Sequence, residues 1–257
     1  MKLTRCLSGL VRALSMQSRP YTAAVLLAGG VGSRMNNTGG PTKQWMMLDG
    51  KPILYHAIKA FEDCPYIDEI VVVCRREEMK AAAELVRTYG FSKVRRIVVG
   101  GKTRQHSAYN GAKRVSEGIK YIAIHDVARC LVTPDDICAA VSAAYSYRAA
   151  MLVGPVQDTI KRVGRDGFIR ETVDREELRC GQTPQVFALP LYIGAASAAL
   201  KSGYTVTDDS MLLEHIGHRV RVIEAKDENF KITTPADLEV AEALLSRRKG
   251  KKKKENS

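Results

Sequence analysis

Short apolar runs alternate with helical patterns along most of the chain. Five runs rich in β-branched or small apolar residues predict buried strands, at 23–28, 69–74, 94–99, 121–124 and 149–156. The segments between them have helical spacing of apolar residues or a capping residue, at 50–61, 76–89, 103–115 and from Thr133 onward. This alternation predicts an α/β domain built on a doubly wound, mostly parallel sheet. Such sheets bind ligands beyond the carboxyl ends of their strands.

The alternation ends after residue 157. Residues 158–163 and 168–173 flank a turn at 164–167, which predicts a β-hairpin. It has too few large apolar residues to form a core, and we expect 158–175 to be a projecting arm for dimerisation. Two helices, a strand and a last helix follow, and they are expected at 189–201, 207–216, 220–225 and from Thr234 onward.

Length and charge indicate one domain with basic ends. The chain has 257 residues and a net charge of +12, of which residues 1–22 contribute +4 and residues 247–257 contribute +6. The remainder is near neutral, so the charge does not by itself indicate a nucleic-acid-binding protein. We expect a domain at 22–246 that includes the arm, a disordered or targeting extension at 1–21 and a disordered basic tail at 247–257. Binding of nucleic acid or of an acidic surface by the tail is the alternative.

The first 22 residues contain Arg and Ser but no acidic residue. This composition fits an organelle transit peptide and a frayed extension equally well. We therefore expect a cytoplasmic protein, with a plastid location as the alternative. No apolar run approaches the roughly 20 residues that a membrane span needs, so no membrane association is expected.

Six cysteines are spread along the chain without a Cys-x-x-Cys pair or a histidine at zinc-ligand spacing. Cys74 and Cys138 lie within apolar patterns. We expect buried thiols in a reducing compartment rather than disulfides or a metal site.

A glycine-rich loop follows the first apolar run. Gly29, Gly30 and Gly32 lack side chains, so the backbone can present N–H groups to an anion, and Arg34 and Lys43 add two cations. These features predict a polyphosphate site, although a structural turn explains the glycines alone about as well.

Neither standard phosphate motif is present. A dinucleotide fingerprint needs a small residue where Met35 stands, and a P-loop ending at 101–103 needs glycine where Arg96 stands. Polar residues do follow two other predicted strands, at 100–107 and 125–129. Because the carboxyl ends of parallel strands meet at one edge, we expect both segments to face the same cleft as the glycine loop.

Eight short motifs occur in order between about residues 22 and 246. They are AGGVGSRM at 28–35, KQ at 43–44, HD-x-x-R at 125–129, DTIKR at 158–162, TVDR at 172–175, QTPQ at 182–185, TDD at 207–209 and NFKIT at 229–233. With this set the chain resembles the 2-C-methyl-D-erythritol 4-phosphate cytidylyltransferases of the non-mevalonate isoprenoid pathway. The alternative is the sister family that makes CDP-ribitol from ribitol 5-phosphate, but the motifs at 158–162 and 172–175 favour the methylerythritol branch.

The resemblance implies a homodimeric nucleotidyltransferase of Rossmann-like fold. It would transfer CMP from CTP to methylerythritol phosphate and release pyrophosphate, a reaction that depends on positioning and on cations that stabilise phosphoryl charge. By resemblance, Arg34 and Lys43 stabilise the transition state, and Arg175 and Lys231 hold the methylerythritol phosphate for attack. Arg175 lies at the end of the arm, so the site would be shared between two subunits.

Further positions match binding residues of the family. The matches to nucleotide contacts are Ala28, Gly29, Gly30, Gly32, Gly101 and Ser107. The matches to substrate contacts are Asp126, Arg129, Thr159 and Thr207. Asp126 is also the expected ligand of Mg²⁺, because a hard cation that bridges phosphates prefers carboxylate oxygen, and Glu228 is a weaker second candidate.

Neighbouring residues have simpler expected roles. We expect His125 to be structural, because an attacking phosphate is already ionised and needs no general base. Trp45 is expected to pack beside the loop. For Asp208 and Asp209, capping of the next helix and a functional role have equal weight.

Three positions depart from the family pattern. Thr42 and Cys130 stand where the family has proline, and Lys102 stands where an acidic residue often follows the glycine. We therefore expect a more mobile first loop and an altered ribose contact. The alternative function, from a different class, is a non-catalytic protein that binds polyanions through its basic tails.

Overall fold

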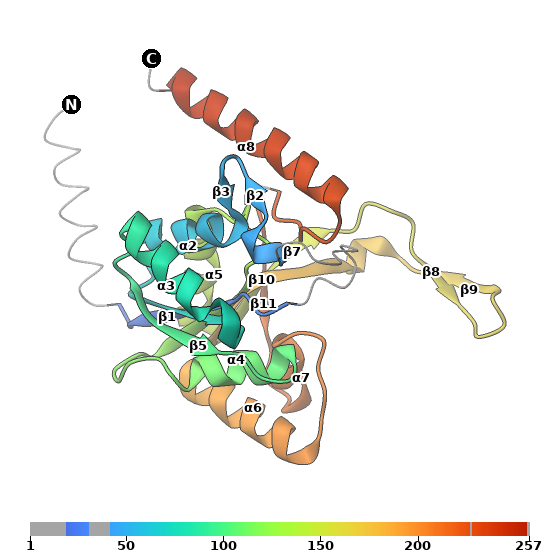
Figure 1. Cartoon of the computed structure of the whole chain (residues 1–257). Helices are drawn as coiled ribbons and strands as arrows, with labels where there is room; N and C mark the ends of the chain where they lie inside the picture. The colour runs from blue at the N-terminus through green and yellow to red at the C-terminus, as the bar shows by residue number, and fades with distance from the viewer. Residues whose placement is uncertain (1–18, 31–41, 227, 256–257) are drawn as a thin grey trace, which may run out of the picture.

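The computed structural model describes residues 19–30, 42–226 and 228–255, the last five of these by their backbone alone. A seven-stranded sheet with the order β11-β7-β10-β6-β1-β4-β5 forms the centre of the described chain (Figure 1). Its strands are β1 (Thr22–Leu27), β4 (Glu69–Cys74), β5 (Val94–Val99), β6 (Tyr121–Asp126), β7 (Ala149–Pro155), β10 (Arg179–Ala188) and β11 (Arg221–Glu224).

The sheet is mostly parallel, as the alternating pattern predicts. β1 pairs in parallel with β4 and β6, β4 with β5, and β7 with β11. Strand β10 runs antiparallel between β6 and β7 and was not among the predicted strands. Gly181 and Pro184 are poor strand formers and the register shifts between Gly181 and Gln185, so the sequence lacks an ordinary strand pattern there.

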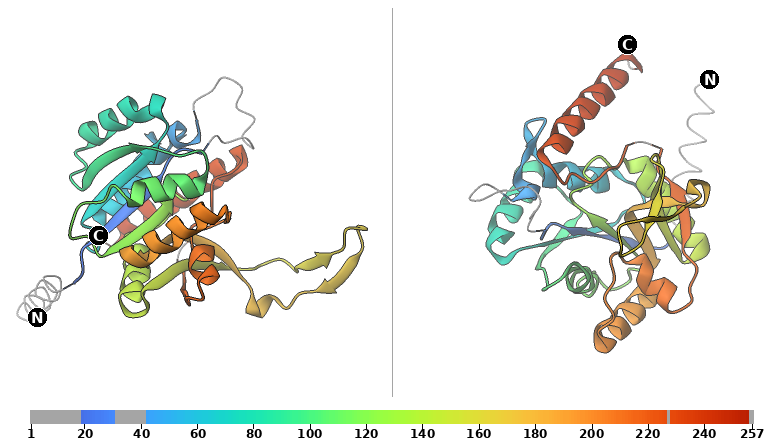
Figure 2. Two further views of the ribbon diagram at one scale, coloured as in Figure 1. Left: turned by 90° about the horizontal axis from the view of Figure 1, so that it is seen from below. Right: turned by 90° about the vertical axis from the view of Figure 1, so that its right-hand side faces the viewer.

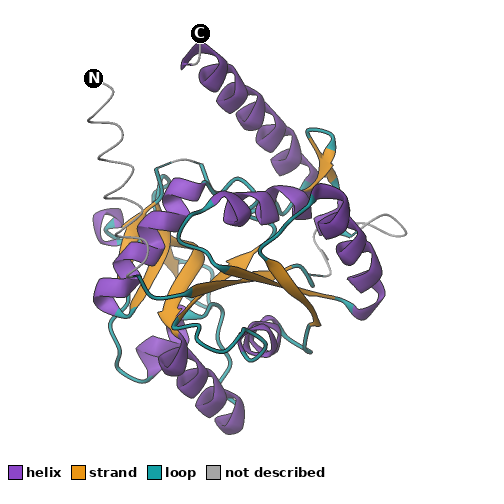
Figure 3. Ribbon diagram, turned by 90° about the vertical axis from the view of Figure 1, so that its left-hand side faces the viewer, coloured by secondary structure: helices purple, strands orange, loops and turns teal. Residues whose placement is uncertain are grey.

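Helices cover both faces of the sheet (Figure 3). They are α2 (Ile53–Asp63), α3 (Met79–Tyr89), α4 (Arg104–Ala112), α5 (Pro134–Tyr147), α6 (Leu189–Ser202), α7 (Ser210–His215) and α8 (Pro235–Glu255). Short elements complete the described chain, namely the 3₁₀ turns η2 (Lys43–Trp45), η3 (Arg76–Glu78) and η4 (Arg175–Glu177) and the strands β2 (Met47–Leu48) and β3 (Lys51–Pro52). None of the helices in the described part of the chain has the length and apolar character to cross a membrane.

Alternate residues of the central strands face two separate cores. Ala24 and Leu26 of β1 belong to the core beneath α2 and α5, whereas Val25 belongs to the core beneath α4 and α6. At Gly111 of α4 an added Cβ would lie 2.5 Å from Val25 Cγ1, so glycine permits the close approach of this helix to the sheet. This packing brings the beginning of α4 close to the strand ends.

The predicted hairpin projects from the body as an arm (Figure 2). Strands β8 (Lys161–Val163) and β9 (Ile169–Thr172) pair antiparallel, and every residue in them is exposed. Four exposed side chains of the arm are large and apolar: Ile160, Val163, Phe168 and Ile169. The arm shares no core with the sheet, as its composition predicts.

Described residues beyond both predicted ends of the domain contact the body. At the amino end, the Arg19 guanidinium makes two hydrogen bonds to Asp68, at 2.7 and 2.8 Å, so residues 19–21 belong to the folded body. At the carboxyl end, α8 continues to Glu255 where a disordered tail was expected. Arg248 donates to the Leu131 carbonyl at 2.6 Å and Lys249 pairs with Asp49, and cations are also favourable near a helix carboxyl end. Residues 1–18 lie outside the described chain.

Candidate active site

Two adjoining cavities open at the carboxyl ends of the central strands. The first has a volume of about 660 Å³ and lies between the ends of β1 and β6, η2 and the beginning of α4. The second, of about 300 Å³, is lined by β10 and by the segment before α7. Arg104, Asp126 and Lys231 line both cavities, so the two form one continuous site.

Backbone pairing fixes the floor of the first cavity. Leu27 and Asp126, the last residues of β1 and β6, are register partners. The Ala28 N–H donates to the Val73 carbonyl at 2.7 Å, and the Val127 N–H donates to Leu27 at 3.1 Å. Three strands therefore end together, at the place where parallel sheets bind their ligands.

The glycines of this cavity have two different roles. At Gly29 and Gly30 an added Cβ would meet no described atom within 4 Å, so packing in the described chain does not require glycine there. Both residues line the cavity, and their missing side chains leave room for a ligand. At Gly101 a Cβ would lie 2.4 Å from His106 Cβ, so the tight turn into α4 requires glycine.

The amino end of α4 borders the same cavity. Thr103 is its N-cap and accepts a hydrogen bond from the His106 N–H at 3.2 Å. Ser107 Oγ accepts from the Gly101 N–H at 3.0 Å and donates to the Thr103 carbonyl at 2.9 Å. A helix amino end beside a glycine turn favours an anionic ligand.

Asp126 lies between two cations at the junction of the cavities. Its carboxylate accepts from Arg104 Nε at 2.9 Å and from Lys231 Nζ at 2.7 Å. Burial raises the pKa of Asp126, but Arg104 and Lys231 more than reverse this effect, so its pKa lies well below the usual range. Asp126 is therefore ionised at neutral pH and neutralises part of the positive charge of the site.

Arg104 connects this carboxylate to a second, fully buried one. Its Nη1 donates to Asp209 at 2.6 Å, and Asp209 also accepts from the Tyr192 hydroxyl at 3.0 Å. Asp209 therefore anchors Arg104 and makes no side-chain cap bond for α7. Asp209 is the N-cap residue by position, but the side-chain acceptor comes from Asp208, which accepts from the Met211 N–H at 3.2 Å. Asp208 also lines the second cavity, so its capping bond and a role in the site remain compatible.

Lys43 is presented to the first cavity by a buried anchor. Glu78 accepts two hydrogen bonds from the Gln44 amide, both at 2.7 Å, and one from the Thr42 hydroxyl. Thr42, which departs from the family pattern, thus gains a hydrogen-bond partner, and the residues on both sides of Lys43 are held by the same carboxylate. Lys43 itself lines the first cavity.

Arg129 and Thr207 line the second cavity. The Arg129 guanidinium donates to the carbonyls of Asn229 at 3.0 Å and Gly181 at 3.1 Å, two neutral acceptors that orient it. The next residue, Cys130, packs in the core, and burial raises the pKa of its thiol to about 12. Cysteine at this position therefore fills core space and does not face the site.

His125 and Trp45 have the structural roles that the sequence indicates. His125 is fully buried, its Nδ1 lies 2.9 Å from the Thr183 hydroxyl, and its ring packs on Phe61 with the centroids 4.9 Å apart. Burial lowers the pKa of His125 to about 3, so the ring is neutral at physiological pH. Trp45 packs against the core of the α2 and α5 face.

Most of the predicted site residues meet in these cavities. The ones that line them are Ala28, Gly29, Gly30, Lys43, Gly101, Ser107, Asp126, Arg129, Thr207 and Lys231. Thr159 and Arg175 instead lie at the base of the arm, where Arg175 donates to the Gln157 carbonyl at 2.8 Å. Glu228 pairs with Arg247 at 2.5 Å and is not among the cavity residues. Gly32 and Arg34 lie outside the described residues.

Arg104 and Gln185 belong to the site but were not assigned roles from the sequence. Arg104 lies in the polar segment 100–107 and Gln185 in the motif at 182–185. Nothing in the linear sequence shows, however, that Arg104 contacts both Asp126 and Asp209. Gln185 donates to Asp208 at 2.9 Å and accepts from the Ser210 N–H at 2.9 Å. For Arg104, the sequence does contain a signal: it is an arginine directly after the predicted N-cap Thr103, near the carboxyl end of a predicted strand.

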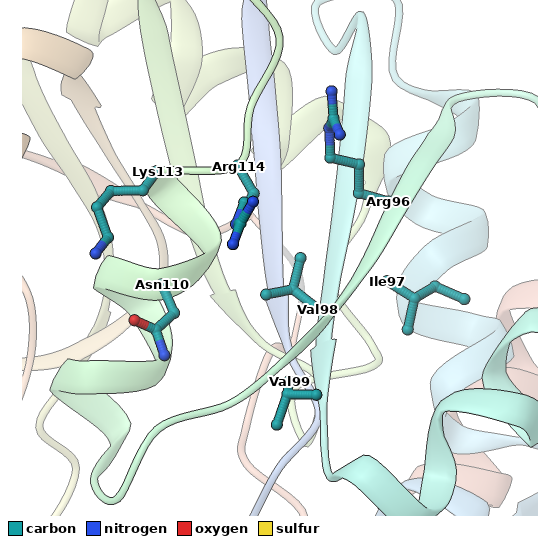
Figure 4. Close-up of a pocket in the computed structure, with 7 residues that line it drawn as sticks. All are labelled: Arg96, Ile97, Val98, Val99, Asn110, Lys113 and Arg114. Carbon is teal, nitrogen blue, oxygen red and sulfur yellow. The ribbon is translucent and has the colours of Figure 1, made fainter.

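A separate hollow of about 500 Å³ lies between the edge strand β5 and α4 (Figure 4). Arg96 from the strand and Lys113 and Arg114 from the end of α4 line it. Cations beside an edge strand are a common device against pairing with another chain. This structural role accounts for the hollow without a ligand.

A family model and the sequences of known proteins point to the same family. The family model for 2-C-methyl-D-erythritol 4-phosphate cytidylyltransferase matches residues 22–247. A relative of that name from Caldanaerobacter subterraneus is 44% identical over 87% of this chain and 98% of its own length. One from Pelotomaculum thermopropionicum is 42% identical over 89% and 96%.

Solved structures show the same similarity. A 4-diphosphocytidyl-2C-methyl-D-erythritol synthase from Anaerococcus prevotii matches with a TM-score of 0.80 and 26% identity, over 90% of this chain and 99% of that one. The 2-C-methyl-D-erythritol 4-phosphate cytidylyltransferase from Thermus thermophilus matches with a TM-score of 0.70 and 29% identity, over 86% and 98%.

Proposed function

Because the chain belongs to the 2-C-methyl-D-erythritol 4-phosphate cytidylyltransferase family, we propose that it transfers CMP from CTP to 2-C-methyl-D-erythritol 4-phosphate. A phosphate oxygen of the polyol attacks the α-phosphorus of CTP, the bond from that phosphorus to the bridging oxygen breaks, and pyrophosphate leaves. The product is 4-diphosphocytidyl-2-C-methyl-D-erythritol. The observation that carries the proposal is the group of cations around Asp126, where the two cavities meet.

The first cavity suits the triphosphate of CTP. It combines the room at Gly29 and Gly30, the amino end of α4 and the cation Lys43. Donors held in place before the reaction stabilise charge that develops on the phosphoryl oxygens and need no rearrangement. By the resemblance, Arg34 joins Lys43 in this role.

The second cavity suits the polyol phosphate. Arg129 is oriented by two carbonyls, and Lys231 reaches the junction where the attacking oxygen must lie. Asp126 offsets part of the charge of Lys231 and Arg104. When anionic substrates bind, these cations can bond phosphate oxygens and Asp126 at once, which orders both substrates for in-line attack.

Asp126 also fits a Mg²⁺ ion that arrives with the nucleotide. Mg²⁺ commonly takes one or two protein carboxylates and completes its shell with phosphates and water. Asp126 is ionised and lines both cavities, whereas the described residues contain no cluster of three or more His, Cys, Asp or Glu that could hold a metal without the substrate. Asp126 would hold the ion, which would neutralise charge on the phosphates.

We propose that the arm of a second copy completes the site. Thr159 and Arg175, which match substrate-binding positions of the family, lie outside both cavities of their own chain. The arm exposes 74% of Phe168 and 63% of Ile169, an apolar surface that a partner would cover.

Mixing two inactive variants tests this shared site. Lys43→Ala and Arg175→Ala each disable one contribution to the site. If the sites are shared, a heterodimer of the two has one intact site and one doubly altered site, so an equilibrated equal mixture regains about a quarter of wild-type activity. Activity no higher than that of the separate variants, with heterodimers demonstrated by mass, would show that each chain forms its own site.

The reaction itself is tested by substrate choice. Purified full-length protein with CTP and Mg²⁺ is expected to release pyrophosphate with methylerythritol phosphate and not with ribitol 5-phosphate. Equal or faster release with ribitol 5-phosphate would overturn the substrate assignment. No release with either polyol phosphate would overturn the proposed activity.

A further inference from the structure

Two thiols from distant parts of the sequence lie in contact inside the body. Cys64 Sγ and Cys138 Sγ are 3.2 Å apart, although the residues are 74 positions apart in the chain. Cys64 is the C-cap residue of α2, and Cys138 lies in the second turn of α5. Five cysteines are described, and they carry thiols rather than disulfides.

The surroundings hold the two sulfurs in this arrangement. Cys64 is completely buried, its N–H donates to the Phe61 carbonyl at 3.3 Å, and its carbonyl accepts from Lys93 Nζ at 2.7 Å. Cys138 is partly exposed and lies beside Ile137, a member of the same core. Cys138 is thus the less buried of the two residues, and Cys64 is held in the core beside it.

We propose that Cys64 and Cys138 form a reversible disulfide when the protein meets a peroxide. The Cys138 thiolate attacks one peroxide oxygen, the O–O bond breaks, and Cys138 becomes a sulfenic acid with release of water. The Cys64 sulfur then attacks the Cys138 sulfur, the S–O bond breaks, and the Cys64 proton leaves with the hydroxyl group as a second water. Two thiols and one hydrogen peroxide thus give one disulfide and two waters.

Closure needs only a small movement, because the sulfurs must approach by about 1 Å to reach the length of a disulfide bond. Cys64 is completely buried and Cys138 is partly exposed, which assigns the first attack to Cys138. The neighbouring Cys138 and burial also raise the pKa of the Cys64 thiol. A small-molecule disulfide such as oxidised glutathione would reach the same product by two exchange steps at Cys138 and Cys64.

The bond would join α2 to α5, which pack in one core beneath the site. Cross-linking positions that are far apart in the sequence restricts the unfolded chain, so we expect oxidation to raise the thermal midpoint by about 5–10 °C. Neither sulfur lines a cavity of the candidate site, so oxidation is expected to leave turnover at 25 °C within about twofold.

Peptide mass spectrometry of the full-length protein after hydrogen peroxide treatment tests the proposal. Trypsin releases Cys64 in residues 60–75 together with Cys74, and Cys138 in residues 130–148 together with Cys130. Fragmentation of the linked peptides must therefore place the bond, and we expect it between Cys64 and Cys138. The rise in midpoint should disappear after dithiothreitol treatment and in Cys138→Ser or Cys138→Ala.

Cys180→Ser is the matched control, because Cys180 is exposed and belongs to a different element. This variant should retain the linked peptide and the rise in midpoint. Oxidation of Cys180 in the wild-type protein while Cys64 and Cys138 stay reduced would overturn the proposal. A bond from Cys138 to any other cysteine, or to a second copy, would do the same.

Discussion

Arg104 contacts both carboxylates that organise the candidate site. It bonds Asp126 at 2.9 Å through one nitrogen and Asp209 at 2.6 Å through another. Burial lowers the pKa of the guanidinium, but Asp209 and Asp126 more than offset this, so Arg104 remains charged. The buried Asp209 thus sets the position of a cation that faces both cavities.

Replacement of Arg104 by lysine tests this arrangement. A lysine carries one compact ammonium group and cannot reproduce the fork that reaches both aspartates. We expect Arg104→Lys to fold but to lose about 10- to 100-fold in kcat/KM for both substrates. Arg114→Lys, two residues beyond the other end of the same helix, is the matched control and should retain wild-type kinetics in the same pyrophosphate assay. Equal kinetics for the two variants would exclude this role of Arg104.

Glu78 has a comparable role for Lys43. Because it binds Thr42 and Gln44 at once, Glu78→Gln should weaken both bonds and lower kcat by roughly tenfold, the loss expected when a catalytic cation is misplaced. Glu77→Gln is the control, since the Glu77 side chain is 70% exposed. Steady-state kinetics distinguish the variants, and an unchanged kcat in Glu78→Gln would contradict this role.

His125 makes stability depend on pH in a predictable direction. Its pKa of about 3 in the folded protein lies below the ordinary value of 6.5, so below pH 6.5 the unfolded chain binds a proton that the folded protein does not. As the pH is lowered below 6.5, the free energy of unfolding should therefore decrease, by up to about 1.4 kcal/mol per pH unit, until the pH approaches 3.

Urea unfolding of His125→Asn between pH 6.5 and 5 checks this contribution. The variant should show a shallower loss of stability with falling pH, whatever its stability at pH 7. His106→Asn changes an exposed histidine and should keep the wild-type slope. Parallel slopes for wild type and His125→Asn would show that His125 does not titrate differently on folding.

At the scale of elements, local patterns predict some segments far better than others. The runs at 69–74 and 121–124 are predictable because strands buried on both faces consist almost entirely of apolar residues. Strand β10 is not, because it contains Gly181 and Pro184, and its first half is polar and is exposed or half-buried until Thr183. Its place in the sheet is determined by contacts with β6 and β7, which no local pattern contains.

Helix α8, at the carboxyl end of the described chain, also depends on contacts that no local pattern contains. A run of like charges predicts disorder, yet Arg248 reaches the Leu131 carbonyl and Lys249 reaches Asp49. Truncation after Ser246 should remove these contacts and lower the thermal midpoint by about 2–4 °C, consistent with a loss of about 1 kcal/mol. Truncation after Lys249 retains them and should leave the midpoint unchanged in calorimetry. Equal midpoints for the two truncations would show that these contacts add no stability.

At the scale of the whole molecule, the sheet brings distant segments to one edge. Lys43, Asp126 and Lys231 come from three parts of the chain and meet because their segments adjoin strand ends. This convergence is predictable from the alternation of strands and helices. The ion pairs of Asp126 and the anchor at Asp209 are not, because their partners are 22 to 105 positions away and depend on the packing of α4 and α7.

The central claim is that CMP transfer occurs in the cavity beside Lys43. The kinetics of Lys43→Ala test this claim most directly. Pyrophosphate release from CTP and methylerythritol phosphate is measured at saturating Mg²⁺ for the wild-type protein and the variant, with circular dichroism to confirm folding. We expect turnover by the wild type and a loss of roughly 10²- to 10³-fold in kcat for Lys43→Ala. A folded Lys43→Ala protein with wild-type turnover would contradict it.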